Sequence, residues 1–316
     1  MTIFRRSGAG FTNPYCEAHP MTQGKSCSSC NDTSCSAQAK KPDETVEEHI
    51  DRQKLETRMC AIKNKIIVLS GKGGVGKSTV SVNLAASLAQ AGHSVGLMDI
   101  DIHGPSLPNL LNLEGQRPKS TGEALLPIKF KDSIKVMSIA FLIPNRDDAI
   151  IWRGPLKMGT IKQFMRDVEW GDLDYLIIDC PPGTGDEPLT IAQTLTNVTG
   201  SVIVTTPQDL AIVDVRKTVT FCDKVGFPVL GVIENMSGFA CPGCGQIHDL
   251  FGSGGGEKMA LDMKVPFLGR VPIELEVRDA ADKGEPMVTA YPESKTAHAF
   301  AAIVENLNVN LAAVKA

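Results

Sequence analysis

The chain has 316 residues, of which 42% are hydrophobic, and this is enough for one large α/β domain with a tail. Its 36 acidic and 32 basic side chains give a formal charge of −4, which argues against a protein that holds nucleic acid through a strongly basic surface. The sequence contains no apolar run of about 18 residues and no secretory-type apolar stretch near its start. We therefore expect a cytoplasmic protein with neither a nucleic-acid nor a membrane partner.

Residues 1–42 are poor in large apolar side chains and rich in Ser, Thr, Gly and Cys, which predicts a flexible tail that does not fold alone. The tail holds four of the nine cysteines, Cys16, Cys27, Cys30 and Cys35. In a reducing compartment, thiolate chemistry or buried thiols are expected rather than disulfides. Four thiolates in one segment could wrap a [4Fe-4S] cluster, and a Zn²⁺ site or unligated thiols are the alternatives.

A charged helix is predicted over residues 43–60, as a linker into a single domain over residues 61–316. In this domain, short apolar runs alternate with helical stretches. The expected strands lie at 65–70, 94–101, 175–180, 201–206, 228–233 and 265–272, and the expected helices at 80–90, 209–224 and 294–314. Apolar strands bounded by helices indicate an α/β fold with a doubly wound, mostly parallel sheet. Weaker signals within 115–150 predict a β-hairpin at one edge of the sheet.

A phosphate-binding loop follows the first strand of the domain. The match to G-x-x-x-x-G-K-[ST] consists of Gly71, Lys72, Gly73, Gly74, Val75, Gly76, Lys77, Ser78 and Thr79. Glycines let the backbone curl so that its N–H groups point at a phosphate, and the following helix adds positive potential. Lys77 should meet the β- and γ-phosphates, and the Ser78 hydroxyl should ligate Mg²⁺. The loop therefore predicts binding of ATP together with Mg²⁺.

Three aspartates come at the ends of apolar strands, Asp99 and Asp101 in MDID and Asp179 in YLIID. A single aspartate in such a place is most often a helix cap or a turn residue. Three of them at the carboxyl edge of one doubly wound sheet favour a ligand site, because ligands bind at that edge. We expect Asp179 to hold Mg²⁺ through water. The backbone N–H of Gly183, a few residues later, could approach a γ-phosphate.

A tight Cys-x-x-Cys knuckle is formed by Cys241 and Cys244 on a loop. Two thiolates cannot close a tetrahedral metal site or hold a four-iron cluster, and no second such pair occurs within the domain. The simplest completion is the same loop of a second chain, across a two-fold axis. A redox pair, or Zn²⁺ shared between subunits, are the alternatives.

Several motifs together resemble a known family. GKGGVGKST is similar to the deviant Walker A loop of the MinD/ParA/Mrp class of dimeric P-loop NTPases, and DCPPGTGDE is similar to the switch II segment of that class. The CPGCG motif with the later FGSGGGEKMA, and the WRGP motif, resemble the Mrp/ApbC-type iron–sulfur carriers over residues 60–310. The four-cysteine tail is similar to the N-terminal extension of the eukaryotic cytosolic scaffold members, with two shorter intervals.

The resemblance implies roles for individual residues. Lys72 would reach across a homodimer to the partner's nucleotide and stabilise the charge of the transition state. Asp101 would orient the attacking water, and Asp99 would support Mg²⁺ or the loop. Asn235 would read the adenine edge, with Pro207 near the base; a turn-forming asparagine after a strand is the alternative for Asn235.

The resemblance also implies a function. The protein would be an ATP-binding carrier that holds a [4Fe-4S] cluster between Cys241 and Cys244 of two chains and transfers it to apo iron–sulfur proteins, with ATP hydrolysis coupled to loading or release. The first alternative is a MinD/ParA-type spatial-organisation ATPase whose cysteines bind structural zinc. The chain end, with one terminal lysine, does not match the basic amphipathic membrane helix of MinD-like members. The second alternative is an electron-transfer ATPase such as nitrogenase iron protein, which bridges a cluster with single, well-separated cysteines.

Overall fold

The structure is a computed structural model, and it describes residues 39–131, 133–143, 154–195 and 197–315. The four tail cysteines lie outside the described residues, as do Trp152 and Arg153 of the WRGP motif. The predicted tail cluster therefore stays a prediction, and the fold below concerns the remaining chain.

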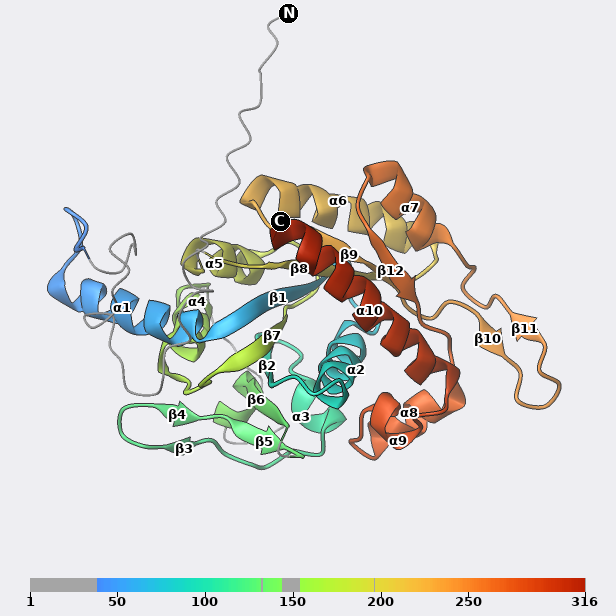
Figure 1. Cartoon of the computed structure of the whole chain (residues 1–316), viewed down its shortest axis with the longest axis horizontal. Coiled ribbons are helices and arrows are strands. Elements are labelled where there is room, and N and C mark those ends of the chain that lie inside the picture. The colour runs from blue at the N-terminus through green and yellow to red at the C-terminus, as the bar shows by residue number, and fades with distance from the viewer. Residues whose placement is uncertain (1–38, 132, 144–153, 196, 316) are drawn as a thin grey trace, which may run out of the picture.

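The described residues form one eight-stranded sheet at the centre of the molecule (Figure 1). The strands are β1 (Ile62–Ser70), β2 (Val95–Asp99), β5 (Ile128–Phe130), β6 (Ile134–Ser138), β7 (Leu173–Asp179), β8 (Gly200–Thr205), β9 (Val229–Glu234) and β12 (Phe267–Arg270). Their order across the sheet is β12-β9-β8-β1-β7-β2-β6-β5. Every pair of neighbours is parallel except β5 with β6, which confirms the predicted mostly parallel sheet.

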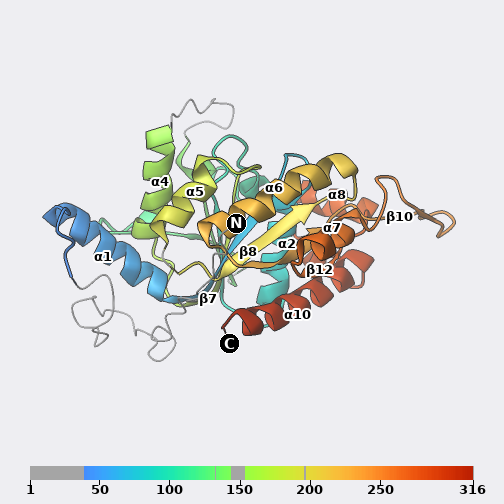
Figure 2. The same cartoon turned by 90° about the horizontal axis from the view of Figure 1, so that it is seen from above.

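Helices cover both faces of this sheet, as Figure 2 shows from above. One face carries α2 (Lys77–Gln90) and α10 (Lys295–Lys315), and the other carries α4 (Gly154–Asp167), α5 (Asp186–Thr194), α6 (Asp209–Val225) and α7 (Gly255–Met263). The short helices α3 (Leu107–Leu110), α8 (Leu275–Asp282) and α9 (Met287–Ala290) lie beside α2. Because helices lie on both faces, the doubly wound fold is confirmed. Within the described part of the chain, no helix is both long and apolar enough to cross a membrane.

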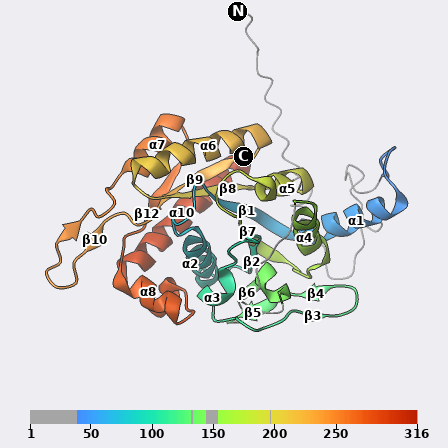
Figure 3. The same cartoon turned by 180° about the vertical axis from the view of Figure 1, so that it is seen from behind.

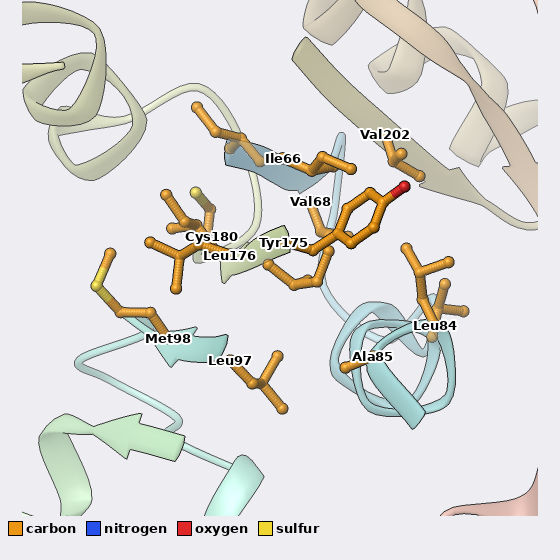
Figure 4. Close-up of a cluster of buried hydrophobic side chains, with 14 of the residues drawn as sticks. Ile66, Val68, Leu84, Ala85, Leu97, Met98, Tyr175, Leu176, Cys180 and Val202 are labelled. Atoms are coloured by element: carbon orange, nitrogen blue, oxygen red, sulfur yellow. The ribbon is translucent and has the colours of Figure 1, made fainter. Parts of the chain in front are cut away.

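The core explains why the central strands read as continuous apolar runs. Side chains from β1, β2, β7 and β8 meet those of α2 in one buried cluster (Figure 4). Ile66 and Val68 of β1, Leu97 of β2 and Leu176 of β7 are all fully buried. Parallel strands with a helix on each face expose neither side to water, so apolar residues do not alternate with polar ones.

The hairpin predicted within 115–150 lies at the edge of the sheet, as expected. β5 pairs antiparallel with β6, with Ile128 opposite Val136 and Phe130 opposite Ile134. β6 also pairs in parallel with β2, so this hairpin extends the main sheet. A second small antiparallel pair, β3 (Lys119–Ser120) with β4 (Leu125–Leu126), was not predicted. Pro127 separates β4 from β5, because proline cannot donate a ladder hydrogen bond.

The segment that bears Cys241 and Cys244 forms a hairpin of its own. β10 (Phe239–Ala240) pairs antiparallel with β11 (Ile247–His248), and the two cysteines lie in the turn between them. We call residues 239–248 the cysteine hairpin. It projects away from the body of the domain in the front and back views (Figure 1, Figure 3). A loop was predicted here, and the structure adds a short two-strand ladder.

The charged helix predicted before the first strand is α1 (Val46–Cys60). Its start is held by a capping box, since the Thr45 hydroxyl accepts from the Glu48 N–H and the Glu48 carboxylate accepts from the Thr45 N–H. Near its C-terminus, Leu55 and Met59 are buried, and the helix packs against α4. The helix predicted as a linker is thus also part of the packed structure.

We predict that α1 contributes to the stability of the domain. Met59→Ala should lower the free energy of unfolding by about 2–5 kcal/mol, because it leaves a cavity at a site with no solvent exposure. Ile50→Ala, on the same helix but 55% exposed, should change it by less than about 0.5 kcal/mol. Urea unfolding followed by circular dichroism measures both. Equal, small effects of the two substitutions would show that α1 does not belong to the cooperative unit.

Candidate functional site

The phosphate-binding loop spans the gap between the end of β1 and the start of α2. Gly74 and Gly76 adopt φ values of 80° and 78°, a left-handed conformation that favours glycine. Gly76 is the N-cap of α2, so the first N–H groups of that helix face the loop. This backbone geometry, at the carboxyl edge of the sheet, suits the predicted binding of an anion.

The carboxylate of Asp179, at the end of β7, is the acceptor on which this site converges. The Lys77 Nζ lies 2.8 Å from Asp179 Oδ2, and the Ser78 hydroxyl donates to the same oxygen at 2.7 Å. The Ser81 hydroxyl donates to Asp179 Oδ1 at 2.6 Å. Lys77 is 6% exposed and Asp179 fully buried. Ser81 was missed in the sequence; the signal was its position one helical turn after Lys77, on the same face of α2.

Asp99 lies directly beside Asp179, because β2 and β7 are parallel neighbours with these two residues in register. Its carboxylate accepts from the Ser138 hydroxyl at 3.0 Å and from the Asp101 N–H at 3.0 Å. Burial raises the pKa of Asp99 to about 8, with a smaller contribution from the neighbouring Asp179 carboxylate. Burial also raises the pKa of Asp101, whose carboxylate accepts from the Gly104 N–H. The structure thus brings together the three aspartates predicted from the sequence.

This set of groups suits a nucleotide with a divalent cation. Mg²⁺ prefers oxygen ligands, and the Ser78 hydroxyl and the Asp179 carboxylate supply them next to the loop. Three carboxyl groups face one buried lysine, so they cannot all be ionised unless a cation balances them. Lys77 could exchange its partner Asp179 for a phosphate without losing a counter-charge.

Two further predicted contacts need some rearrangement or a partner. The Gly183 N–H, expected at a γ-phosphate, donates to the Ser70 carbonyl oxygen at 2.8 Å, so that bond would have to open. Lys72 lies at the start of the loop and is partly exposed. Within the described chain, its ammonium makes no hydrogen bond or ion pair. Its predicted action in a second subunit stays a prediction.

Asn235 contacts the phosphate-binding loop, whereas Pro207 lies against the segment that follows the cysteine hairpin. The Asn235 side-chain amide donates to the Val75 carbonyl oxygen at 2.9 Å, and the Asn235 N–H donates to the Thr205 carbonyl oxygen at 2.8 Å. Pro207 packs near Gly252, in the segment that returns from the cysteine hairpin. The adenine-reading role of Asn235 therefore stays a prediction, whereas its contact with the phosphate-binding loop is observed.

The two thiols of the cysteine hairpin lie on the surface. Cys241 is partly exposed and Cys244 exposed. Hydrogen bonds from the Gly243 N–H, the Cys244 N–H and the Cys244 thiol lower the pKa of Cys241, which favours the thiolate that binds metals. Among the residues that the structure describes, no group of three or more potential metal ligands occurs. The cysteine hairpin thus supplies two ligands and leaves the others to come from elsewhere.

Comparisons with known proteins agree with this geometry. The chain matches the family described as NUBPL iron-transfer P-loop NTPase, of the ParA group, over residues 61–308. The iron–sulfur cluster carrier protein of Methanocaldococcus jannaschii is 50% identical over 254 residues, which are 80% of this chain and 87% of that protein. The protein of the same name from Methanococcus maripaludis is 43% identical over 281 residues, 89% of this chain and 95% of that protein.

Solved structures show the same architecture. A nucleotide-binding protein from Archaeoglobus fulgidus, in complex with ADP, is 41% identical and superposes with a TM-score of 0.66, over 75% of this chain and 92% of that one. The septum site-determining protein MinD of Pyrococcus horikoshii, with Mg-ADP, is 24% identical with a TM-score of 0.59, over 80% of this chain and 99% of that one. At 24% identity, the second likeness shows the fold alone.

The buried carboxylates predict a pH dependence of stability. The pKa of Asp99 is about 8 in the folded chain, against an ordinary value of about 4 when unfolded, so the folded state binds the proton more tightly. The free energy of unfolding should therefore fall as the pH rises from about 4 to 8. Asp99→Asn, which keeps the shape of the neutral acid, should remove much of this fall. Urea unfolding of nucleotide-free protein at several pH values between 5 and 8 measures it.

Asp174→Asn is the matched control, because the pKa of Asp174 is lowered whereas that of Asp99 is raised. Burial by itself would raise the pKa of Asp174, but hydrogen bonds from Lys63 and Ser94 outweigh burial and lower this pKa to about 2. Its contribution is present above about pH 4 and is lost only as the pH falls toward 2, so the slope between pH 5 and 8 should stay that of the wild type. An unchanged slope in Asp99→Asn would contradict the prediction.

Proposed function

The chain belongs to the NUBPL-type iron-transfer P-loop NTPase family, and from this premise we propose that it is an ATP-binding iron–sulfur cluster carrier. One observation carries the proposal: a single domain combines a phosphate-binding site around Lys77 and Asp179 with an exposed hairpin that offers two thiols and no further ligand among the described residues. The names of the two relatives at 50% and 43% identity support the same cargo.

The carrier works as a homodimer in this proposal. A [4Fe-4S] cluster takes four thiolates, and Cys241 and Cys244 of two chains supply them across a two-fold axis. The dimer also gives Lys72 a partner, since its ammonium would reach the nucleotide of the second subunit. Two different sites therefore call for the same assembly.

The place of the cysteine hairpin suits a cluster that is cargo. Its projection from the domain body, with Cys244 exposed, lets an apo iron–sulfur protein approach the thiols directly (Figure 3). A cluster buried in the core would need the carrier to unfold before transfer. The recipients in this proposal are apo iron–sulfur proteins, and the compartment is the cytoplasm. The four tail cysteines would hold a second cluster.

At the nucleotide site, each residue has one task in the proposed mechanism. The loop N–H groups and Lys77 bind the phosphates, and Ser78 and Asp179 would hold Mg²⁺, which supplies positive charge when bound. Asp101, partly buried on the segment after β2, accepts a hydrogen bond from the attacking water and orients it. Lys72 of the second subunit stabilises the charge that develops on the phosphoryl oxygens. Hydrolysis is coupled to loading or release of the cluster.

We predict that Cys241→Ser abolishes the bridging cluster. The test uses anaerobically reconstituted protein on a background with Cys27 and Cys30 changed to serine, so that the tail does not contribute iron. The parent should be brown, dimeric by light scattering, and hold about four iron and four sulfide per dimer. Cys241→Ser should be colourless, because a half-site with one thiolate cannot retain the cluster. Iron and sulfide assays with an absorbance spectrum report the result.

Cys222→Ala serves as control, because that thiol is fully buried in α6 and should leave the cluster intact. A labile cluster that persists in Cys241→Ser would contradict the proposal. A colourless parent with stoichiometric zinc would instead favour the spatial-organisation ATPase with a structural zinc site.

Lys72→Ala should separate hydrolysis from binding. We expect the hydrolysis rate to fall about 10³-fold, because charge stabilisation in trans is lost. ATP affinity should change little, since Lys77 and the loop remain. Lys77→Ala should instead lose affinity as well as rate. Equilibrium binding of a fluorescent ATP analogue and a phosphate-release assay measure the two quantities. Hydrolysis by Lys72→Ala at the wild-type rate would exclude the role in trans.

A further inference from the structure

A buried glutamate ties together both ends of the segment that carries the cysteine hairpin. Glu234 is the last residue of β9 and is fully buried. Its Oε1 accepts from the Ser237 hydroxyl at 2.6 Å and from the Gly254 N–H at 2.8 Å, and its Oε2 accepts from the Gly256 N–H at 2.5 Å. Ser237 lies where the chain leaves the sheet, and Gly254 and Gly256 lie where it returns. One carboxylate therefore holds the two roots of the hairpin side by side.

The surroundings of this carboxylate are fitted to it closely. A Cβ atom at Gly256 would lie 3.0 Å from Glu234 Oε2 and 3.0 Å from Thr205 Cγ2, so a side chain there would displace the carboxylate. Gly254 adopts φ 81° as the N-cap of α7. The Arg270 guanidinium lies 3.7 Å from Glu234 Oε1 and supplies a nearby positive charge. The hairpin roots are thus fixed by charge-assisted hydrogen bonds to a carboxylate that is buried from solvent.

The next residue, Asn235, is hydrogen-bonded to the phosphate-binding loop. The Asn235 side chain donates to the Val75 carbonyl oxygen of the phosphate-binding loop at 2.9 Å, and Gly76 lies so close to it that no side chain would fit there. Met236 follows at φ 58°, a left-handed conformation that turns the chain sharply away toward the hairpin. Glu234 therefore holds the hairpin roots, and the adjacent Asn235 holds the phosphate-binding loop.

We infer that Glu234 is a positioning residue that orients the cysteine hairpin relative to the phosphate-binding loop, so that nucleotide at the loop changes the exposure of Cys241 and Cys244. This inference rests on the proposed function. A nucleotide can shift the hairpin only if some contact differs between the two states. In this inference the bond between Asn235 and Val75 is that contact, because the loop that supplies the Val75 carbonyl would also bind the phosphates. Glu234 passes that displacement to both roots at once.

A purely structural role for Glu234 makes a different prediction. If the carboxylate only caps α7, its loss would lower stability and leave the response to nucleotide unchanged. The decisive quantity is therefore the ratio of the thiol alkylation rates with and without nucleotide. A general loss of stability would not by itself change this ratio.

The test is Glu234→Gln in the full-length chain. Glutamine keeps the shape, but its amide NH₂ must face one of the three donors, so at least one hydrogen bond is lost. The reduced, cluster-free protein is alkylated with iodoacetamide, with and without Mg·ATP, and the rates at Cys241 and Cys244 are read from their peptide by mass spectrometry. In the wild type, we expect the rates with and without nucleotide to differ at least about fivefold. In Glu234→Gln, this ratio should approach one, with ATP affinity within about threefold of the wild type.

Two further variants complete the design. Asp174→Asn removes a hydrogen-bonded carboxylate at the start of β7, the edge of the sheet away from the loop, and should keep the wild-type ratio. Ser237→Ala removes one donor and leaves the charge with its two backbone N–H partners. It should lower the ratio partway, and it decides the question if Glu234→Gln does not fold.

The inference is overturned if Glu234→Gln, or Ser237→Ala in its place, responds to Mg·ATP as the wild type does. A wild type whose thiol reactivity ignores nucleotide overturns it as well. Iron and sulfide content of a separate, anaerobically reconstituted wild-type sample tests the proposed function on its own. A cluster held at the dimer interface, together with an unchanged ratio in the variants, would reject the role of Glu234 and leave the carrier function standing.

Discussion

The buried carboxylate of Asp179 is the interaction on which the nucleotide site depends. It holds one ammonium and two hydroxyls from the first turns of α2, and it lies at the end of β7, next to β1. In a medium of low dielectric constant, a charge paired in this way is stable, whereas the loss of one partner leaves an uncompensated charge. The carboxylate therefore fixes how α2 sits on the sheet, and with it the shape of the phosphate-binding loop.

The same edge carries more carboxyl groups than its one lysine could balance if all of them were ionised. Asp99 and Asp179 lie side by side because β2 and β7 are in register, and the burial of Asp99 makes its proton hard to remove. A site of this kind is suited to a ligand that brings cations with it. Proton, metal ion and lysine are alternative counter-charges for one cluster of carboxylates, so occupancy of the site and the electrostatics of the fold are linked.

The cysteine hairpin obeys the opposite constraint. It lies on a projection and contributes little to the core, which in the proposed carrier would let it meet both a second chain and a recipient. Such a projection needs a firm base if it is to report on the nucleotide. Glu234 and Asn235 provide that base, one on the hairpin roots and one on the phosphate-binding loop. The contacts to the hairpin roots and to the phosphate-binding loop thus both start from the end of one strand, β9.

The amino-acid sequence alone determined the sheet, the phosphate-binding loop and the Cys-x-x-Cys pair of Cys241 and Cys244. Apolar runs, glycines before a Lys-Ser pair and a Cys-x-x-Cys spacing report local backbone geometry and ligand chemistry, which act over a few residues. The partners of those residues came only from the tertiary structure. Ser81 meets Asp179 across 98 positions in the sequence, and Gly256 meets Glu234 across 22. Such pairs depend on strand order, on register and on the crossover that returns a helix to the sheet, and no local pattern encodes these.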